Sequence, residues 1–210
     1  MMYKRYIKRL LDIVIAGAAL VLLSPVIILL ALLVRMKLGS PVIFQQERPG
    51  YKTKIFTLKK FRTMTDARDQ EGNLLSDADR LTGFGRMLRR TSLDELPELW
   101  NIFRGDMSLI GPRPLLVSYL PYYTEREQLR HTVRPGLTGL AQISGRNFLE
   151  WDKRLEKDVQ YVENLSFGLD VKIFFTTIKQ VFIHEDVAED TDIVEGNLAE
   201  IRAEKLKAEE

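Results

Sequence analysis

Residues 13–34, IVIAGAALVLLSPVIILLALLV, decide the fold because 22 consecutive residues carry no charge. A helix of about 20 apolar residues spans the hydrocarbon core of a bilayer, so we expect this segment to enter a membrane. The run is too long for the apolar region of a secretory signal, and no small-residue cleavage pattern precedes Lys37. We therefore predict a membrane segment and not a cleaved leader.

Ser24-Pro25 interrupts this segment at its midpoint. Proline removes a backbone hydrogen bond and bends a helix, and the Ser24 hydroxyl could satisfy a carbonyl freed at the break. Each half, of about 11 residues, would reach about 16 Å as a helix, close to the depth of one leaflet. By the positive-inside rule both ends prefer the cytoplasm, because basic residues flank both: Lys4, Arg5, Lys8, Arg9, Arg35 and Lys37. A re-entrant helix and a kinked spanning helix both remain open on these residues.

The rest of the chain is basic and ends in an acidic tail. A length of 210 residues suffices for one domain with a real core. Residues 185–210 carry ten acidic and three basic residues, so the net charge of +2 conceals a basic body that favours anionic partners. The tail has little apolar content and is expected to be solvated or frayed. The absence of cysteine excludes disulfides, thiolate metal sites and cysteine nucleophiles.

Apolar patterning after the membrane segment predicts one α+β unit that is mostly α-helical. Residues 41–60 favour a small β-hairpin, because two short apolar runs flank the turn signal Pro49-Gly50. Residues 66–80 are polar and loop-like, and residues 134–147 are rich in turns because they contain three glycines. Helices are expected over 95–104, 114–130, 150–164 and 169–183. The last helix has an apolar face, which either packs on the core or lies as an interfacial amphipathic helix on the membrane.

Residues 91–114, TSLDELPELWNIFRGDMSLIGPRP, hold a high density of charge between apolar residues. Ser92 and Glu95 fit the S-x-x-E capping box of a helix N-terminus. Pro97 counts against that interpretation, since it would fall at the fifth helical position and remove a hydrogen bond. A helix that begins nearer Pro97 would leave Asp94 and Glu95 before it, free to meet a ligand. Such carboxylates serve phosphoryl transfer as a nucleophile or as Mg²⁺ ligands, and a neighbouring glutamate could act as a base.

Gly111-Pro112-Arg113-Pro114 presents one guanidinium on a turn with two fixed φ angles, which suits bidentate phosphate binding. A surface turn with a solvated arginine explains the same residues. Arg89 and Arg90 are interpreted either as solvated or headgroup-contacting residues or as compensation for the nearby carboxylates, and Lys60 has the same ambiguity. Two acidic residues at predicted helix ends would be assigned to solvent from the pattern alone: Asp158 and Asp170.

Five blocks of sequence carry a resemblance to a known family: KRLLDIVIAGAALVLLSP, KKFRTM, LRRTSLDELPELWNIFRGDMSLIGPRPLL, RPGLTGLAQISGRN and DVQYVENLSFGLDVKIFF. They lie within residues 8–183. The chain resembles the bacterial sugar transferases, the monotopic phosphoglycosyl transferases that begin membrane glycoconjugate assembly, and its length is similar to that of the minimal members. In that family the membrane segment is a re-entrant helix broken at Ser-Pro, so the resemblance favours re-entry at Ser24-Pro25. The acidic tail lies outside the match.

The resemblance implies a covalent mechanism on a UDP-sugar with Mg²⁺ as the cofactor. Asp94 matches the aspartate that attacks the sugar-bearing phosphate, which releases UMP and leaves an aspartyl phosphosugar. Undecaprenyl phosphate then takes the phosphosugar, giving undecaprenyl-diphospho-sugar, and Glu95 matches the carboxylate that assists this acceptor step. Mg²⁺ is implied near the pair, with Asp94 as its ligand. The other matched positions around the phosphate site are Lys60, Arg89, Arg113, Asp158 and Asp170.

The predicted organisation is a re-entrant membrane helix over residues 1–36, a catalytic domain over 37–184 and an acidic tail over 185–210. We expect the catalytic domain on the cytoplasmic face of the bacterial inner membrane, in contact with inner-leaflet lipids. Nucleic-acid binding is not expected, because the sequence has no basic helix or aromatic platform motif. The sequence does not decide whether the protein forms a homodimer. The alternatives are direct transfer without a covalent intermediate and a non-catalytic membrane scaffold. The residues do not identify the sugar, whose specificity we expect in loops 66–80 and 144–150.

Overall fold

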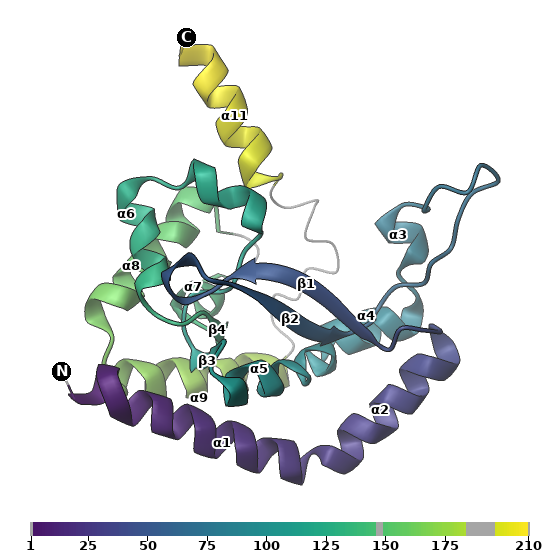
Figure 1. Ribbon diagram of the computed structural model, residues 1–210, viewed down its shortest axis with the longest axis horizontal. Helices are drawn as coiled ribbons and strands as arrows, with labels where there is room; N and C mark the ends of the chain where they lie inside the picture. The colour runs from purple at the N-terminus through teal and green to yellow at the C-terminus, as the bar shows by residue number, and fades with distance from the viewer. Residues whose placement is uncertain (1, 146–148, 184–195, 210) are drawn as a thin grey trace.

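The N-terminal helices form a V beneath a small body of short helices and two-stranded sheets in the computed structural model (Figure 1). The structure describes residues 2–145, 149–183 and 196–209. A π-helical turn, Tyr3–Ile7, leads into α1 (Lys8–Leu22), and α2 (Ser24–Lys37) follows after one residue. The chain bends by 63° between the two arms.

The bend lies at the predicted Ser24-Pro25 break. Pro25 falls in the first turn of α2, where a backbone N–H has no partner in the helix, so α2 can start there but α1 cannot continue through it. The Ser24 hydroxyl donates to the Val21 carbonyl at 2.8 Å, as expected for a carbonyl freed at the break. Over the described ranges no single helix has the length and apolarity to cross a bilayer, whereas the bent pair satisfies both measures together.

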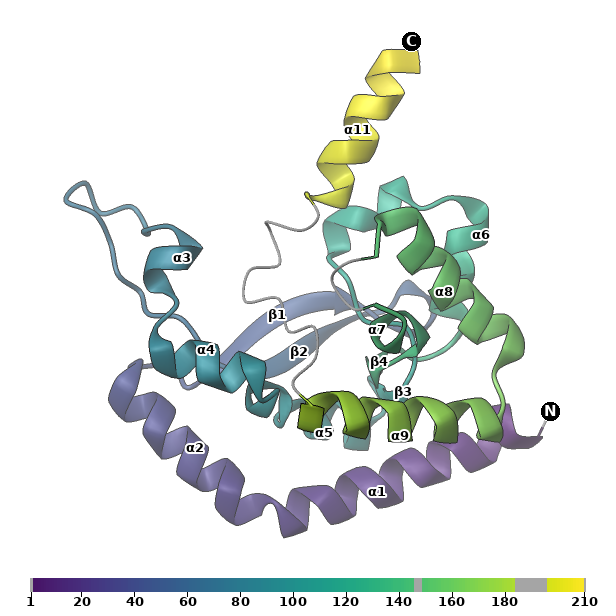
Figure 2. The ribbon, with the colours of Figure 1, turned by 180° about the vertical axis from the view of Figure 1, so that it is seen from behind.

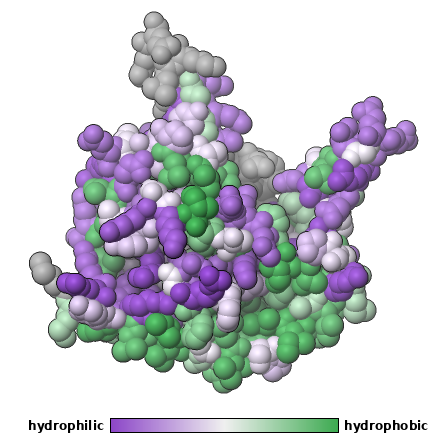
Figure 3. All heavy atoms as spheres, in the orientation of Figure 1, coloured by the Kyte–Doolittle hydropathy of each residue, from purple (hydrophilic) through white to green (hydrophobic). Residues whose placement is uncertain are grey.

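The underside of the V is apolar, as the lower edge of the molecule shows (Figure 3). The inner side of each arm packs on the body, with Ala16 of α1 beside Ile102 and with Val34 of α2 beside Leu88. An apolar surface of this kind marks a membrane or protein interface. The outer side chains are exposed: Val14, Val21, Leu22, Ile28, Leu29 and Leu32.

Two strands form the predicted hairpin, β1 (Ile43–Pro49) and β2 (Ile55–Phe61), and they pair antiparallel. Side chains alternate between the two faces of a strand. Leu58 is buried in the core, so Lys60, two residues further on, lies on the inner face, and Lys59 lies on the outer face.

α5 (Glu98–Arg104) closes the free edge of β2. The buried Asn101 side chain accepts a hydrogen bond from the Lys59 backbone N–H at 3.1 Å and donates to the Thr57 carbonyl at 2.8 Å. The edge of a sheet leaves such backbone groups unpaired, and here the amide takes the place of a third strand. The hairpin is thereby fixed to the helix that follows the carboxylate pair.

A second sheet, parallel and not predicted, joins β3 (Ser108–Ile110) to β4 (Gly136–Thr138). Beside it the backbones of Gly111 and Gly136 come so close that a Cβ atom on Gly136 would lie 2.1 Å from the Gly111 nitrogen. The Gly136 N–H donates to the Pro112 carbonyl at 2.9 Å. The Gly-Pro-Arg-Pro turn is therefore held against β4.

The continuous helix predicted over 114–130 is wrong. Pro121 lacks the N–H that a continuous helix needs, and the backbone of Tyr123 is extended. The segment instead contains three short pieces: the 3₁₀ turn Val117–Tyr122, α6 (Glu125–Gln128) and the 3₁₀ turn Leu129–Thr132.

The polar segment 66–80 extends away from the body as a loop, as predicted, and ends in one short helix (Figure 1). The remaining helices of the body include the two predicted towards the C-terminus, here α8 and α9. Their bounds are α3 (Asp77–Arg80), α4 (Gly83–Arg90), α7 (Leu140–Ile143), α8 (Trp151–Asn164) and α9 (Phe167–Ile183).

α9 runs beside α1 (Figure 2). The Lys8 ammonium of α1 pairs with Asp170 of α9 at 2.7 Å, and the Tyr3 ring packs edge-on against Phe167. The core-packing interpretation is confirmed for one side, which packs on the core through the buried Ile173. The interfacial position on a membrane stays a prediction, and the other side exposes apolar side chains: Phe174, Phe175 and Ile178.

The acidic tail contains a helix, α11 (Leu198–Glu209), so the prediction of a frayed end is wrong for this part. Leu198 is buried in a cluster with Leu115 and Tyr119. The Arg202 guanidinium lies 2.6 Å from Glu127 and 2.8 Å from Asp152, and these two contacts dock the first turns of α11. The low apolar content of the tail gave no indication of the buried Leu198 or of the two ion pairs of Arg202. Residues 184–195 of the chain lie outside the described residues.

Candidate active site

The Asp94-Glu95 pair lies in a 3₁₀ turn, Leu93–Glu95, between α4 and α5. The capping-box interpretation of Ser92 is wrong: Ser92 adopts a left-handed backbone with φ 54°, and over the described chain its side chain caps no helix. Pro97 occupies the position before α5, which begins at Glu98. Both carboxylates therefore stand ahead of the helix, as the position of Pro97 led us to expect.

Glu95 is held by two cations. The Lys60 Nζ lies 2.7 Å from Glu95 Oε1, and the Arg113 guanidinium lies 3.0 Å from the same oxygen. Burial alone would raise the pKa of Glu95, but the Lys60 ammonium and the Arg113 guanidinium outweigh burial and lower the pKa to about 2. Glu95 is thus an anion at neutral pH, and its charge is already compensated.

Asp94 has a different environment. It is only 7% exposed, and Lys60 and Arg113 both pair with Glu95 instead. Burial, with the neighbouring Glu95 charge, raises the pKa of Asp94 to about 6. Within the part of the chain that the structure describes, no ion pair occupies its carboxylate, so Asp94 is the member of the pair whose oxygens are available.

Two further charged residues belong to this cluster and were missed from the sequence, Glu98 and Arg48. The Lys60 Nζ lies 3.2 Å from Glu98 Oε1, so one ammonium bridges two carboxylates. Burial raises the pKa of Glu98 to about 7 although Lys60 opposes the shift. Burial, with the Arg113 charge, lowers the pKa of Arg48 to about 10. Alternation along the hairpin was the available signal, since Arg48 and Lys60 share its inner face.

A buried ion pair between Arg130 and Asp158 contacts the backbone of Arg113. One terminal nitrogen of Arg130 donates to Asp158 Oδ2 at 2.7 Å and to the Arg113 carbonyl at 2.7 Å. The helical pattern alone assigned Asp158 to solvent, and this prediction is wrong because Asp158 is only 2% exposed. Asp158 reaches the site through Arg130 and the backbone of Arg113.

Of the other two predicted site residues, Arg89 lies near Asp94, whereas Asp170 lies between α9 and α1. The Arg89 Nε donates to the Thr63 hydroxyl at 3.1 Å, and its charge acts on Asp94. Asp170 is buried rather than solvent-facing, and it accepts hydrogen bonds from Lys8 at 2.7 Å and from the Tyr161 hydroxyl at 2.8 Å. It therefore joins α9 to the start of α1, and substrate contact by Arg89, Asp158 or Asp170 stays a prediction.

The donor set suits a divalent cation that arrives with its substrate. No cage of three or more histidine or acidic side chains exists among the described residues. Mg²⁺ is usually bound by one or two carboxylates together with substrate phosphates and water, and the available Asp94 carboxylate fits that pattern. Mg²⁺ at Asp94 stays a prediction. Chemically, one available carboxylate beside several cations suits nucleophilic attack on an anionic phosphate.

Known proteins match nearly the whole chain. The family described as bacterial sugar transferase matches residues 3–184. An uncharacterised sugar transferase of Bacillus subtilis (strain 168), EpsL, is 54% identical over 181 residues, which cover 86% of this chain and 90% of that protein. The exopolysaccharide production protein ExoY of Rhizobium meliloti (strain 1021) is 39% identical over 191 residues, which cover 83% of this chain and 84% of ExoY.

A longer relative has a name that states a reaction. The UDP-glucose:undecaprenyl-phosphate glucose-1-phosphate transferase of Escherichia coli (strain K12) is 40% identical over 191 residues, which cover 86% of this chain and 41% of that protein. The family match and the identity to EpsL each extend over most of the chain. The chain therefore belongs to the bacterial sugar transferase family and is a transferase enzyme.

Proposed function

We propose that the chain transfers a sugar 1-phosphate from a UDP-sugar to undecaprenyl phosphate, giving undecaprenyl-diphospho-sugar and UMP through a covalent intermediate on Asp94. The observation that supports the proposal most is that two adjacent carboxylates have different partners. Glu95 forms ion pairs with Lys60 and Arg113, whereas Asp94 is buried and its oxygens are available for a substrate. The name of the Escherichia coli relative specifies UDP-glucose and undecaprenyl phosphate, which supports the same classes of donor and acceptor here.

In the first step an Asp94 carboxylate oxygen attacks the sugar-bearing phosphorus of the UDP-sugar. The bond from that phosphorus to the bridging oxygen breaks, UMP leaves with the electron pair, and the phosphosugar remains on Asp94 as an acyl phosphate. Arg113 and Lys60, which lie beside the pair, stabilise the charge that moves onto the phosphate oxygens. Mg²⁺ bound by Asp94 and the diphosphate would neutralise part of the charge on the leaving UMP.

In the second step a phosphate oxygen of undecaprenyl phosphate attacks the same phosphorus, and Asp94 leaves as a carboxylate. A phosphate monoester is ionised at neutral pH and needs no base to attack. Glu95, with a pKa of about 2, is in any case a weak proton acceptor. We therefore assign Glu95 the positioning of Lys60 and Arg113, a narrower role than the assistance that the resemblance implies.

The V is proposed to lie in the inner leaflet of the inner membrane, with the body on the cytoplasmic side. The exposed apolar side chains of α1 and α2 support immersion in lipid, and the basic residues before and after them support a return to the same side. A lipid-borne phosphate would then arrive on the same side of the membrane as Asp94.

Isotope exchange tests the covalent route. Labelled UMP is incubated with the protein, an unlabelled UDP-sugar and Mg²⁺, without acceptor, across a panel of UDP-sugars. Because the first step is reversible, label is expected to enter the UDP-sugar that the enzyme uses, and Asp94→Asn is expected to abolish this exchange. Glu47→Gln, which alters an exposed carboxylate on the outer face of the hairpin, serves as the matched control.

Direct transfer between the two bound substrates predicts no exchange in the absence of undecaprenyl phosphate. A non-catalytic scaffold predicts neither exchange nor release of UMP under any condition. Undiminished UMP release by Asp94→Asn would contradict the assignment of the nucleophile.

A further inference from the structure

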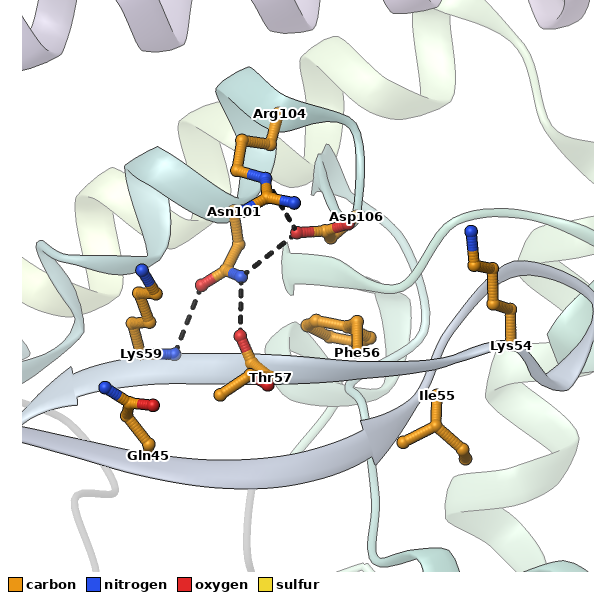
Figure 4. Close-up of a pocket in the computed structure, with 9 residues that line it drawn as sticks. All are labelled: Gln45, Lys54, Ile55, Phe56, Thr57, Lys59, Asn101, Arg104 and Asp106. Carbon is orange, nitrogen blue, oxygen red and sulfur yellow. Dashed lines mark hydrogen bonds and ion pairs between the residues drawn. The ribbon is translucent and has the colours of Figure 1, made fainter.

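A pocket of about 400 Å³ lies on the outer face of the hairpin (Figure 4). Side chains alternate along β2, so Lys59 lines this pocket while the next residue, Lys60, reaches Glu95 on the inner face. None of Lys60, Asp94, Glu95 and Arg113 lines the pocket, which is therefore distinct from the candidate active site. Its lining includes Gln45, Lys54, Thr57, Lys59, Arg104 and Asp106.

The pocket carries three cations and one carboxylate. The Arg104 Nε lies 3.8 Å from Asp106 Oδ2, which is a loose ion pair, and over the described ranges no ion pair involves Lys54 or Lys59. Glu47 lies on the same face of the hairpin but does not line the pocket. The net positive charge in a hollow attracts an anion.

The pocket lies at the depth where α1 begins its apolar run. Arg9, the last basic residue before residues 13–34, donates to the carbonyls of Ile102 and Phe103 at 2.7 and 2.8 Å. These carbonyls directly precede Arg104, so Arg104 is level with the basic flank of the membrane segment. Figure 4 shows the side chains of Lys54 and Lys59 extending towards the side on which the N-terminal helices lie, while the Arg104 guanidinium points from α5 towards Asp106.

Two exposed aromatic side chains of α5 lie beside the same part of the molecule. Trp100 and Phe103 of α5 are 43% and 41% exposed, and their ring centroids are 6.1 Å apart. Phe103 packs over Gly17 of α1, where a Cβ atom would lie 3.3 Å from its ring. Tryptophan is enriched at the bilayer interface, and phenylalanine and tryptophan occur on helix faces that contact the boundary between headgroups and acyl chains, so both rings suit a position close to phospholipid headgroups.

We propose that this pocket binds the phosphate headgroup of an anionic bilayer phospholipid, such as phosphatidylglycerol. The proposal rests on the membrane placement given above and not on the reaction. Lys54 and Lys59 offer ammonium groups to a phosphodiester, and Arg104 offers a guanidinium fork. Undecaprenyl phosphate and free phosphate share this chemistry, but neither Asp94 nor Glu95 lines the pocket, which does not suit an acceptor subsite.

Native mass spectrometry of the protein from mixed micelles of detergent and phosphatidylglycerol tests the proposal. One variant, Lys54→Gln/Lys59→Gln/Arg104→Gln, removes the charge. A second, Thr57→Trp, fills the pocket and keeps the charge. The matched control, Arg126→Gln/Lys153→Gln/Lys157→Gln, removes the same charge from α6 and α8. We expect the wild type and the control to retain a phosphatidylglycerol that both pocket variants lose. In the charge variant the affinity for phosphatidylglycerol is expected to fall about fivefold for each cation removed, because a basic residue near an anionic surface contributes about 1 kcal/mol.

Retention of phosphatidylglycerol by both pocket variants would overturn the proposal. Displacement of this lipid by an equal amount of undecaprenyl phosphate, or by inorganic phosphate, would also overturn it, because the pocket would then be an acceptor subsite or a free-phosphate site. UMP release in detergent is expected to stay at the wild-type rate in both pocket variants, and its loss in both would count against a site separate from Asp94. Failure of the proposed reaction would appear instead as absent UMP release in the wild type.

Discussion

Asp94 and Glu95 are neighbours in the chain, yet the fold gives them opposite protonation behaviour. The 3₁₀ turn directs Glu95 to Lys60 and Arg113, which stabilise its ionised form. When the pair carries one proton, that proton is therefore on Asp94 more often than on Glu95. Their pKa values of about 2 and about 6 follow from that division. A carboxylate that ionises nearer neutral pH is more basic, and it therefore attacks phosphorus more readily once ionised.

The first half-reaction is expected to lose rate as the pH falls through about 6, because the raised pKa of Asp94 leaves this carboxyl half protonated there. The measurement is the burst of UMP release against pH, with UDP-sugar and Mg²⁺ but no acceptor. Glu95→Gln removes the neighbouring charge that helps to raise the pKa of Asp94, so the midpoint is expected to move to lower pH.

The control for this profile is Glu47→Gln, because Glu47 is exposed on the outer face of the hairpin. Its midpoint is expected to match the wild type. A midpoint that is unchanged by Glu95→Gln would show that another group governs the profile.

The residues of the site differ in how far the sequence could reveal them. Asp94, Glu95 and Arg113 fall in one continuous stretch, where Pro97 and the Gly-Pro-Arg-Pro turn indicated that side chains are presented and not merely solvated. Glu98 and Arg48 were harder to find, because alternation places Arg48 on the inner face of the hairpin but does not show which residues that face meets. Their proximity depends on the register of the hairpin and on where α5 begins, and neither is fixed by a local pattern.

At the scale of elements, α8 supports the Gly-Pro-Arg-Pro turn through the buried Arg130–Asp158 pair. Asp158→Asn would leave the Arg130 charge buried without its carboxylate, which is expected to lower the free energy of unfolding by about 3–5 kcal/mol. Urea unfolding in detergent, followed by tryptophan fluorescence, measures the change. UMP release is expected to fall as well, because the same guanidinium holds the Arg113 carbonyl.

Glu163→Gln is the matched control for that substitution, because Glu163 lies on the same helix and pairs with Arg126 at the surface. An exposed pair of this kind is expected to contribute less than about 1 kcal/mol. Similar losses from the two substitutions would refute the supporting role of Asp158.

α11 is expected to stabilise the segment 117–132, because Arg202 accounts for the docking of its first turns on Glu127 and Asp152. Arg202→Met would leave two carboxylates without their shared guanidinium. Faster hydrogen exchange is therefore expected in residues 117–132 and in α11, with little change in β1 and β2. Lys153→Met, at an exposed position on α8, is the control, and unchanged exchange in 117–132 of the Arg202 variant would contradict the docking.

The elements that the sequence predicted well are those with a strong local signal. The hairpin has its turn at Pro49-Gly50, and α8 and α9 have clear helical periodicity. The pair β3–β4 has no such signal, because two strands of three residues come together from distant parts of the chain. Residues 114–130 misled because their apolar spacing is helical while Pro121 prevents a continuous helix.

At the scale of the whole molecule, both arms of the V are attached to the body. Lys8 and Asp12 of α1 bind Asp170 and Ser108, and Val34 of α2 is buried near Leu88. A straight spanning helix would have to detach one arm and expose its buried side chains. Packing thus favours re-entry, a distinction that the apolar run and its flanks left open.

Single-cysteine labelling tests this topology, and the native chain contains no cysteine to interfere. Re-entry predicts that Lys4→Cys and Asn73→Cys react with an impermeant maleimide in inverted membrane vesicles and not in spheroplasts. Val21→Cys, at the exposed tip of the V, is expected to react in neither because the tip lies in lipid. Labelling of Lys4→Cys in spheroplasts would instead indicate a spanning helix.

The most direct test of the central claim is the intact mass of the protein after incubation with its UDP-sugar and Mg²⁺ without acceptor, followed by acid quenching and peptide mapping. A mass increase of one phosphosugar is predicted on the peptide that contains Asp94. The increase should be absent in Asp94→Asn and should disappear when undecaprenyl phosphate is added. Unmodified protein during rapid UMP release, or a phosphosugar on any other residue, would contradict the claim.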